Sequence, residues 1–252
     1  MSSGLQGRRA VITGAGRNVG AAIAERFVRE GARVAVVDID PSAAARIAKE
    51  LNDQYPDSAV PVTADVSSPQ EVQRLVDEAW EQLGAVDTLV NCVAITDRPH
   101  TVLDLPDELW SKVLDVSLTS AFLTTKYLAR RMVVEESGGV VLHIGSTSGM
   151  FARKNAVAYP AAKAALYALV RSLAVQLGEH GIRVNTVSPN KVGSPVGSAV
   201  EPADRARRNL VGRACTPEDI AGAVAFMAGA DAGFITGTDL LVDGGALITS
   251  GD

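Results

Sequence analysis

The chain has 252 residues, of which 47% are hydrophobic and 21% are charged, and this is enough to bury one large core. Its formal net charge of −5 argues against nucleic acids and anionic membranes as partners. The first nine residues hold no apolar signal core and no apolar stretch approaches the length that spans a bilayer, so we expect a cytoplasmic protein.

Short apolar runs alternate with amphipathic segments along almost the whole chain. The runs are continuous rather than alternating, which is typical of strands buried on both faces of a parallel sheet. They lie at residues 10–13, 33–37, 88–91, 140–144, 183–187 and 240–242. Helical spacing covers residues 19–30, 42–54, 69–83, 106–134, 158–179 and 217–230. Repeated strand–helix–strand units predict an α/β fold, with a doubly wound parallel sheet of about seven strands in a single Rossmann-type domain over residues 1–252.

The segment between residues 188 and 216 has no clear periodicity. Long segments of this kind inside compact α/β domains are usually lids or binding loops. We therefore expect a substrate lid at about residues 189–215.

The first apolar run leads into a glycine-rich turn and then into a helix. The turn reads TGAGRNVG over residues 13–20, with Asn18 where a glycine would be usual. Asn tolerates positive φ better than most residues, so we expect this turn to keep its shape. A strand, a glycine-rich turn and a helix N-terminus together favour binding of a dinucleotide pyrophosphate. Alone, the turn is also compatible with a tight β-to-α connection.

Asp38 ends the second apolar run, 18 positions after Gly20. A carboxylate there accepts hydrogen bonds from a ribose 2′-hydroxyl and repels a 2′-phosphate, so we predict NAD as the cofactor and NADP as less favoured. An alternative is that Asp38 caps the next helix, although Asp40 or Ser42 fits that position better. Arg17 either offsets the repulsion of a 2′-phosphate or pairs with Asp38.

Tyr159 and Lys163 lie four residues apart at the start of a predicted helix, so their side chains share one face. A nearby cation favours the tyrosinate, which suits Tyr159 for acid–base chemistry. Ser146 follows the apolar run at 140–144, at the carboxyl end of a strand, where ligands bind in open α/β sheets. Tyrosine and lysine at this spacing also occur by chance on many helices.

In order and spacing these features resemble the short-chain dehydrogenases/reductases, and the resemblance covers nearly the whole chain. It rests on the 13–20 turn, Asp65-Val66, Asn91, Ser146, Tyr159xxxLys163, Pro189, and the motifs TPEDI at 216–220 and ITG…VDGG at 235–245. The resemblance implies reversible hydride transfer between a nicotinamide cofactor and a secondary alcohol or ketone. It also implies a homotetramer or homodimer that pairs through two long helices.

The resemblance further implies roles for individual positions. Tyr159 would be the acid–base group, Ser146 would orient the substrate, and Lys163 would bind the nicotinamide ribose and lower the Tyr159 pKa. Asn91 would stabilise the central strands, and Val192 would contact the carboxamide. The cofactor residues implied are Gly14, Arg17, Asn18, Val19, Gly20, Asp38, Asp65, Val66 (the last two beside the adenine), Asn91, Tyr159, Lys163, Pro189, Val192 and Ser194.

Four positions depart from the family's pattern. Ser117 takes the place of a catalytic asparagine that helps to hold a water in the proton relay, and its side chain is shorter. Ala94 replaces a glycine after the fourth strand. Asn18 and Asn190 replace glycines, and asparagine is compatible with the left-handed backbone that glycine often adopts. The changes at Ser117 and Ala94 point to an alternative, a cofactor-binding protein with impaired or lost turnover, but the intact Ser146, Tyr159 and Lys163 argue against it.

Other polar residues are assigned no role. His143 lies within an apolar run and is expected in the core. His100, with Asp97 and Arg98, is expected in a solvated loop, with the edge of the substrate cleft as the alternative. The three arginines between residues 205 and 208 fit a solvated helix face better than an anion site.

Two cysteines, Cys92 and Cys215, lie far apart and have no CxxC or His-rich neighbourhood. Neither a disulfide nor a metal site is therefore expected.

Overall fold

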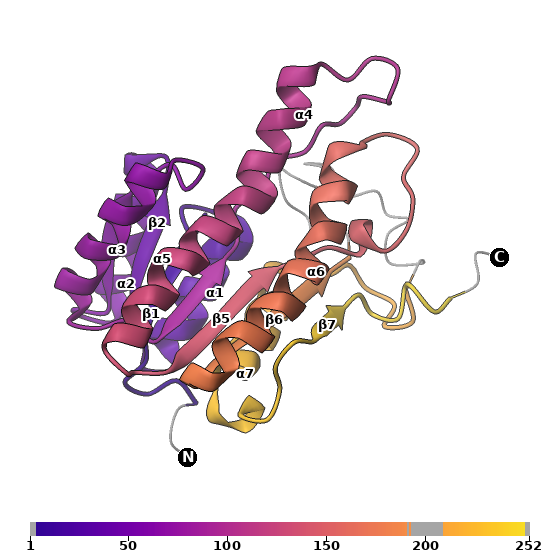
Figure 1. Cartoon of the computed structure of the whole chain (residues 1–252). Coiled ribbons are helices and arrows are strands. Elements are labelled where there is room, and N and C mark those ends of the chain that lie inside the picture. Colours follow the sequence, from indigo (N-terminus) through magenta and orange to yellow (C-terminus); the bar gives the residue numbers. More distant parts are fainter. Residues whose placement is uncertain (1–3, 191, 193–208, 250–252) are drawn as a thin grey trace.

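Seven parallel strands form the central sheet in the computed structural model, which describes residues 4–190, 192 and 209–249 (Figure 1). Their order is β3-β2-β1-β4-β5-β6-β7. The strands are β1 (Arg9–Thr13), β2 (Arg33–Asp38), β3 (Ala59–Thr63), β4 (Thr88–Asn91), β5 (Gly139–Ile144), β6 (Ile182–Pro189) and β7 (Asp239–Val242). The predicted doubly wound parallel sheet is thus confirmed.

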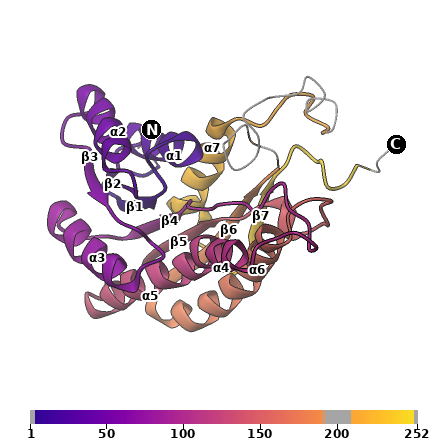
Figure 2. The ribbon, with the colours of Figure 1, turned by 90° about the horizontal axis from the view of Figure 1, so that it is seen from above.

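Helices cover both faces of the sheet (Figure 2). They are α1 (Asn18–Arg29), α2 (Pro41–Gln54), α3 (Pro69–Leu83), α4 (Asp107–Leu114), α5 (Ser120–Val134), α6 (Ala158–Leu177) and α7 (Pro217–Ala228). One apolar cluster joins α1, α2 and α7 to the sheet, and a second joins α3, α5 and α6 to the other face. In β5, Leu142 belongs to the first cluster and Val141 to the second, so continuous apolar runs fill both layers. No described helix is long and apolar enough to cross a membrane.

Strand β3 has no counterpart among the predicted apolar runs. Its sequence, AVPVT, contains Pro61, which pairs in register with Val36 of β2. Proline has no N–H to donate and is confined to sheet edges, and β3 is the edge strand. Pro61 therefore interrupts the apolar run, so that the strand is hard to predict from the sequence, and it also fits the position of β3 at an edge of the sheet.

The long helix predicted over residues 106–134 contains a π turn. Helix α4 passes into the π turn η1 (Asp115–Thr119), which continues into α5. Ser117, inside η1, accepts a hydrogen bond from the Ile95 N–H at 3.2 Å and donates one to the Ile95 carbonyl at 3.2 Å. Single π turns inside α-helices are frequent at functional sites. Here the turn holds the helix against the segment that follows β4.

The predicted lid at residues 189–215 falls largely outside the described residues, which omit 191 and 193–208. The three arginines between 205 and 208 fall there too. The lid therefore stays a prediction.

Candidate active site

A cavity of about 1170 Å³ opens at the carboxyl ends of the strands. It lies where the chain order reverses between β1 and β4, the point at which open α/β sheets bind ligands. Predicted site residues that line it are Gly14, Arg17, Asn18, Val19, Gly20, Asp38, Asp65, Val66, Ser146, Tyr159, Lys163, Pro189 and Val192. Asn91 and Ser117 are not part of its lining, and Ser194 is outside the described residues.

The glycine-rich turn brings the start of α1 very close to β1. A Cβ on Gly20 would lie 2.1 Å from the Gly14 carbonyl oxygen, so only glycine fits there. Gly14 itself has a φ of +66°. Asn18 has a φ of +47°, which confirms that it replaces glycine at a left-handed position.

The N-terminus of α1 differs from those of α2, α3 and α7. These three helices begin at side chains that accept hydrogen bonds from first-turn N–H groups, namely those of Asp40, Ser68 and Thr216. Helix α1 begins after Arg17, and no described side chain caps it. Its first N–H groups therefore face the cavity as donors, and the helix dipole adds positive potential. This arrangement fits a pyrophosphate.

Asp38 is fixed at the rim of the cavity by two backbone N–H groups. Its Oδ2 accepts from Gly16 at 2.9 Å and its Oδ1 accepts from Asp40 at 3.1 Å. The cap of α2 is Asp40, which accepts from Ser42 at 2.9 Å and from Ala43 at 3.3 Å. The alternative that Asp38 caps this helix is therefore wrong.

Two arginines flank this rim. Arg17 is exposed and, in the described part of the chain, forms no ion pair with Asp38, in contrast to one of the expectations. Arg46, on α2, donates to the Gly16 carbonyl at 3.0 Å and pairs with Glu50 at 3.0 Å. Sequence analysis did not find Arg46, because its approach to the turn depends on how α2 packs.

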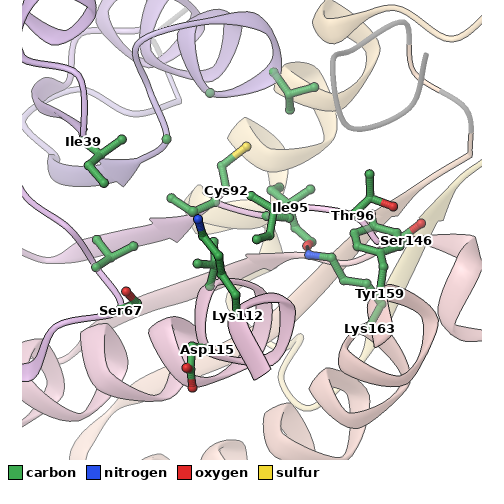
Figure 3. Close-up of a pocket in the computed structure, with 18 of the residues that line it drawn as sticks. Ile39, Ser67, Cys92, Ile95, Thr96, Lys112, Asp115, Ser146, Tyr159 and Lys163 are labelled. Carbon is green, nitrogen blue, oxygen red and sulfur yellow. Dashed lines mark hydrogen bonds between the residues drawn. The ribbon is translucent and has the colours of Figure 1, made fainter. Parts of the chain in front are cut away.

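Ser146, Tyr159 and Lys163 gather where β5 ends beside α6 (Figure 3). The Lys163 ammonium donates to the Ile144 carbonyl at 2.7 Å and lies 5.8 Å from the centre of the Tyr159 ring. The Ser146 hydroxyl donates to the Ser148 hydroxyl at 3.0 Å and accepts from the Ser148 N–H at 3.1 Å. The sequence-predicted catalytic residues other than Ser117 thus meet at one end of the cavity.

Burial dominates the electrostatics of this group. It raises the pKa of the Tyr159 hydroxyl, against a hydrogen bond with Ser146 and the nearby charges of Arg153 and Arg98. It lowers the pKa of Lys163 to about 8. We expected Lys163 to lower the Tyr159 pKa, but in this structure the cations that do so are the two arginines.

Asp97 caps the catalytic helix from the loop after β4. Its buried carboxylate accepts from the N–H groups of Val157, of Ala158 at 2.8 Å and of Tyr159 at 3.1 Å. Burial raises the pKa of this carboxyl, but the three N–H groups together hold it below its usual value. The prediction of a solvated loop is therefore wrong for Asp97, because the sequence does not show which backbone a distant carboxylate meets.

Tyr167 is a further residue that the sequence analysis missed. Its hydroxyl donates to the Ser146 carbonyl at 2.6 Å and lies 3.1 Å from the Ser188 hydroxyl. It stands four residues after Lys163 and eight after Tyr159, so all three share one face of α6. That spacing is the signal that could have identified it.

Asn91 joins four elements beneath the cavity. Its Oδ1 accepts from Thr124 on α5 at 2.8 Å and from Thr13 on β1 at 3.5 Å, and its Nδ2 lies 3.3 Å from His143 Nδ1 on β5. His143 is fully buried, as predicted for a core residue, and burial lowers its pKa to about 3. Polar contacts therefore hold β1, β4 and β5 together directly below the site.

Two other departures from the family's pattern have structural partners. The side chain of Asn190 accepts from the Thr147 hydroxyl at 3.1 Å. Asn190 is not among the described residues with positive φ, so the expectation of left-handed backbone is wrong at this position. The Ser117 hydroxyl exchanges hydrogen bonds with the Ile95 backbone and, among the described residues, forms none with Lys163. Ala94 lines the cavity.

Comparison with known proteins gives consistent matches along the chain. A family model described as enoyl-(acyl carrier protein) reductase matches residues 14–246. The 3beta-hydroxysteroid dehydrogenase 2 of Eggerthella lenta is 34% identical, over 96% of this chain and 95% of that protein. Among solved structures, a short-chain type dehydrogenase/reductase from Mycobacterium marinum is 32% identical, with a TM-score of 0.92 and 98% of both chains covered. A 3-ketoacyl-(acyl-carrier-protein) reductase from Brucella melitensis, solved with NADH, is 32% identical, with a TM-score of 0.88 and coverage of 96% of this chain and 99% of that one.

Proposed function

Because the chain belongs to the short-chain dehydrogenase/reductase family, it is an oxidoreductase that acts on CH–OH groups with a nicotinamide cofactor, and we propose that Tyr159 is its acid–base residue. The observation that carries the proposal is the meeting of Tyr159, Lys163 and Ser146 at one end of the cavity. The uncapped N-terminus of α1 lines the same cavity.

The proton follows a short path in this proposal. The bound nicotinamide supplies the hydride acceptor in alcohol oxidation and the hydride donor in ketone reduction. Ser146 orients the substrate oxygen, and Tyr159 takes the hydroxyl proton in oxidation or returns it in reduction. Burial raises the Tyr159 pKa, so the free tyrosine stays protonated, which is the form that donates in ketone reduction. Alcohol oxidation needs the tyrosinate, which must first lose its proton to solvent and which the charges of Arg153 and Arg98 favour. Lys163, held by the Ile144 carbonyl, places a cation beside the ring.

The polar rim supports NAD as the cofactor in preference to NADP. Asp38 is held in place by two N–H groups and keeps oxygen lone pairs for ribose hydroxyls. Its negative charge opposes a 2′-phosphate. Arg17 and Arg46 lie close to the same turn and partly offset that repulsion. The first-turn N–H groups of α1 would hold the pyrophosphate.

The assembly and the location of the protein remain predictions. Phe122 on α5 and Val175 on α6 expose 42% and 83% of their surfaces, which supports pairing of subunits through these two helices in a homotetramer or homodimer. A cytoplasmic location is expected from the sequence.

The Tyr159→Phe variant tests the proposed function. We expect it to lose about 100-fold or more in kcat, because that is the contribution of a positioned acid–base group, and to keep its binding of NADH. Tyr127→Phe, which removes the same atom from α5 outside the cavity, is the matched control and keeps its activity. A folded Tyr159→Phe protein that retains more than about a tenth of the wild-type kcat contradicts the assignment. A wild-type protein that binds NADH but converts no member of a broad panel of ketones and alcohols supports the alternative without turnover.

A further inference from the structure

Two arginines, Arg98 and Arg153, line the same cavity as Tyr159. Both act electrostatically on the Tyr159 hydroxyl, so they lie on the side where the reacting carbon of a substrate would be. The residues that hold the pyrophosphate belong to the turn after β1, a different part of the lining. The two cations are therefore placed for the substrate rather than for the cofactor phosphates.

The backbone around these arginines is held firmly. Asp97, which directly precedes Arg98, accepts three hydrogen bonds from the start of α6. The His100 carbonyl accepts from the Ala156 N–H at 2.8 Å. These four bonds tie the segment that carries Arg98 to the one that carries Arg153. The backbone segments that carry the two arginines are therefore held next to each other by the fold.

Within the described residues, Arg153 has no hydrogen-bond acceptor of the kind that Arg183 has. Its Nε is buried and has no partner in this part of the chain, and its guanidinium lies 5.4 Å from the centre of the Phe151 ring. Arg183, which is buried to a similar degree, donates to the carbonyls of Ile235 and Met227 at 3.1 and 2.9 Å. Buried donors are normally satisfied within the protein. Arg153 as a whole is only half-buried and lines the cavity, so a ligand bound to its guanidinium would supply an acceptor that the described residues do not.

The charges point to the same kind of ligand. Burial and the like charge of Arg98 both lower the pKa of Arg153, so two neighbouring cations face one partly desolvated space. A bound anion would remove both penalties. Asp107 and Glu108 also line the cavity, but both are exposed and, among the described residues, neither pairs with Arg153.

We propose that the alcohol or ketone substrate carries a carboxylate group, which Arg98 and Arg153 bind while Tyr159 serves the hydroxyl or keto oxygen. Arginine forks match the two oxygens of a carboxylate, and such charge-assisted hydrogen bonds are among the strongest that proteins form. The inference rests on the proposed function for the placement of the reacting oxygen at Tyr159. The anion site itself is independent of turnover.

Binding to the protein loaded with NADH tests the anion site directly. Cyclohexanecarboxylate and cyclohexanecarboxamide have nearly the same shape and differ in charge, and neither can be oxidised at a hydroxyl. We expect the carboxylate to bind about tenfold or more tightly than the amide, as measured by calorimetry. Arg153→Gln and Arg98→Gln should each reduce this preference to about threefold or less, whereas Lys154→Gln, which removes an exposed charge next to Arg153, should keep it.

The outcomes separate the anion site from the proposed function. A carboxylate that binds no more tightly than the amide, or a preference that survives both arginine variants, overturns the inference. Tighter binding of cyclohexyl phosphate than of the carboxylate overturns the choice of carboxylate. If the carboxylate preference depends on the arginines but the protein converts neither 4-hydroxycyclohexanecarboxylate nor other hydroxy acids, the proposed function fails and the anion site stands. If the protein converts the hydroxy acid and its methyl ester equally well and shows no preference for the carboxylate in binding, the anion site fails and the proposed function stands.

Discussion

Asp38 is the residue on which the choice between NAD and NADP depends. Its carboxylate is held by the N–H groups of Gly16 and Asp40, so it cannot easily move away from a ligand that enters the turn. A 2′-phosphate would meet this fixed negative charge in a partly desolvated cleft. Arg17 and Arg46 weaken the repulsion, but Arg46 is already paired with Glu50. We therefore predict a preference for NAD.

The expected result is a higher kcat/KM for NAD(H) than for NADP(H), and Asp38→Ala should narrow the difference. The variant loses hydrogen bonds to the ribose, which weakens NAD(H), and it loses the repulsion, which helps NADP(H). Each change should be about tenfold, the equivalent of one charged hydrogen bond. Asp40→Ala, which removes only the cap of α2, is the control. Steady-state kinetics with both cofactors decide the matter, and a wild-type kcat/KM for NADP(H) that equals or exceeds that for NAD(H) refutes the prediction.

Residue types and spacing predict those parts of the site that a single segment carries. Asn18 at positive φ and the shared helical face of Tyr159 and Lys163 follow from local stereochemistry. Arg153 and Asp97 were not predicted as site residues, because their positions depend on contacts between segments about 60 residues apart. Ser117 was placed in the site by resemblance, and only the structure shows that its hydroxyl is bound by Ile95.

At the scale of elements, α6 depends on a cap from outside the helix. Val157 is at the N-cap position, where its apolar side chain cannot accept a hydrogen bond. Asp97, in the loop after β4, accepts hydrogen bonds from the first N–H groups of the helix instead. A carboxylate at a helix N-terminus also interacts favourably with the helix dipole. Because Tyr159 lies in the first turn, the same bonds set the position of its ring. Asp97 is therefore a positioning residue for the proposed chemistry.

Asp97→Ala should lower the free energy of unfolding by about 1–2 kcal/mol, the usual effect of losing a cap, and should also lower kcat. Ser68→Ala removes the cap of α3, which carries no predicted catalytic residue, and should affect stability alone. Asp97→Asn keeps one acceptor and should recover part of kcat. Urea unfolding and kcat, measured on all three variants, provide the test. Equal activity of the Asp97→Ala and Ser68→Ala proteins would assign Asp97 a purely structural role.

Helix and strand patterns predict elements well where a periodic run is unbroken. The runs that became β5 and β6 are almost wholly buried, although they include His143, Arg183 and Asn185, and both lie inside the sheet. β3 was missed because proline interrupts it, and the π turn at η1 was missed because one additional residue barely alters helical spacing. Periodicity reports burial, so features that leave burial unchanged do not appear in it.

At the scale of the whole molecule, a row of polar side chains links the central strands of the sheet directly beneath the cavity. Asn91 and His143 lie in register on β4 and β5, and Thr13 on β1 completes the row. The row lies just before the carboxyl end of β5, where Ser146 follows the strand and the Ile144 carbonyl accepts from Lys163 of α6. The parallel sheet and its reversal point were predictable from alternating strand and helix patterns, but the polar row required knowledge of strand order.

His143 makes the stability of the whole molecule depend on pH. Burial and then the charge of Lys163 lower its pKa from 6.5 to about 3, and its Nε2 has no hydrogen-bond partner among the described residues. The unfolded chain therefore binds a proton below pH 6.5 that the folded protein does not accept until about pH 3. Since the unfolded state binds more protons in this range, the free energy of unfolding falls as the pH falls, by up to about 1.4 kcal/mol per pH unit.

Asp239, whose pKa burial raises, contributes to the pH dependence with the opposite sign, and it does so equally in the wild-type protein and in a His143 variant. The difference in slope between these two proteins between pH 6.5 and 4.5 therefore isolates His143. Asp97 and Asp219 have lowered pKa values, so the stability that they contribute is lost only as the pH falls below their ordinary value of 3.8. Urea unfolding across the interval should show a clear slope in the wild-type protein and a much smaller one in His143→Asn, whatever that variant's absolute stability. His180→Gln, at an exposed position, should keep the wild-type slope. If His143→Asn also keeps the wild-type slope, His143 is not the group responsible for the pH dependence, and the prediction is wrong.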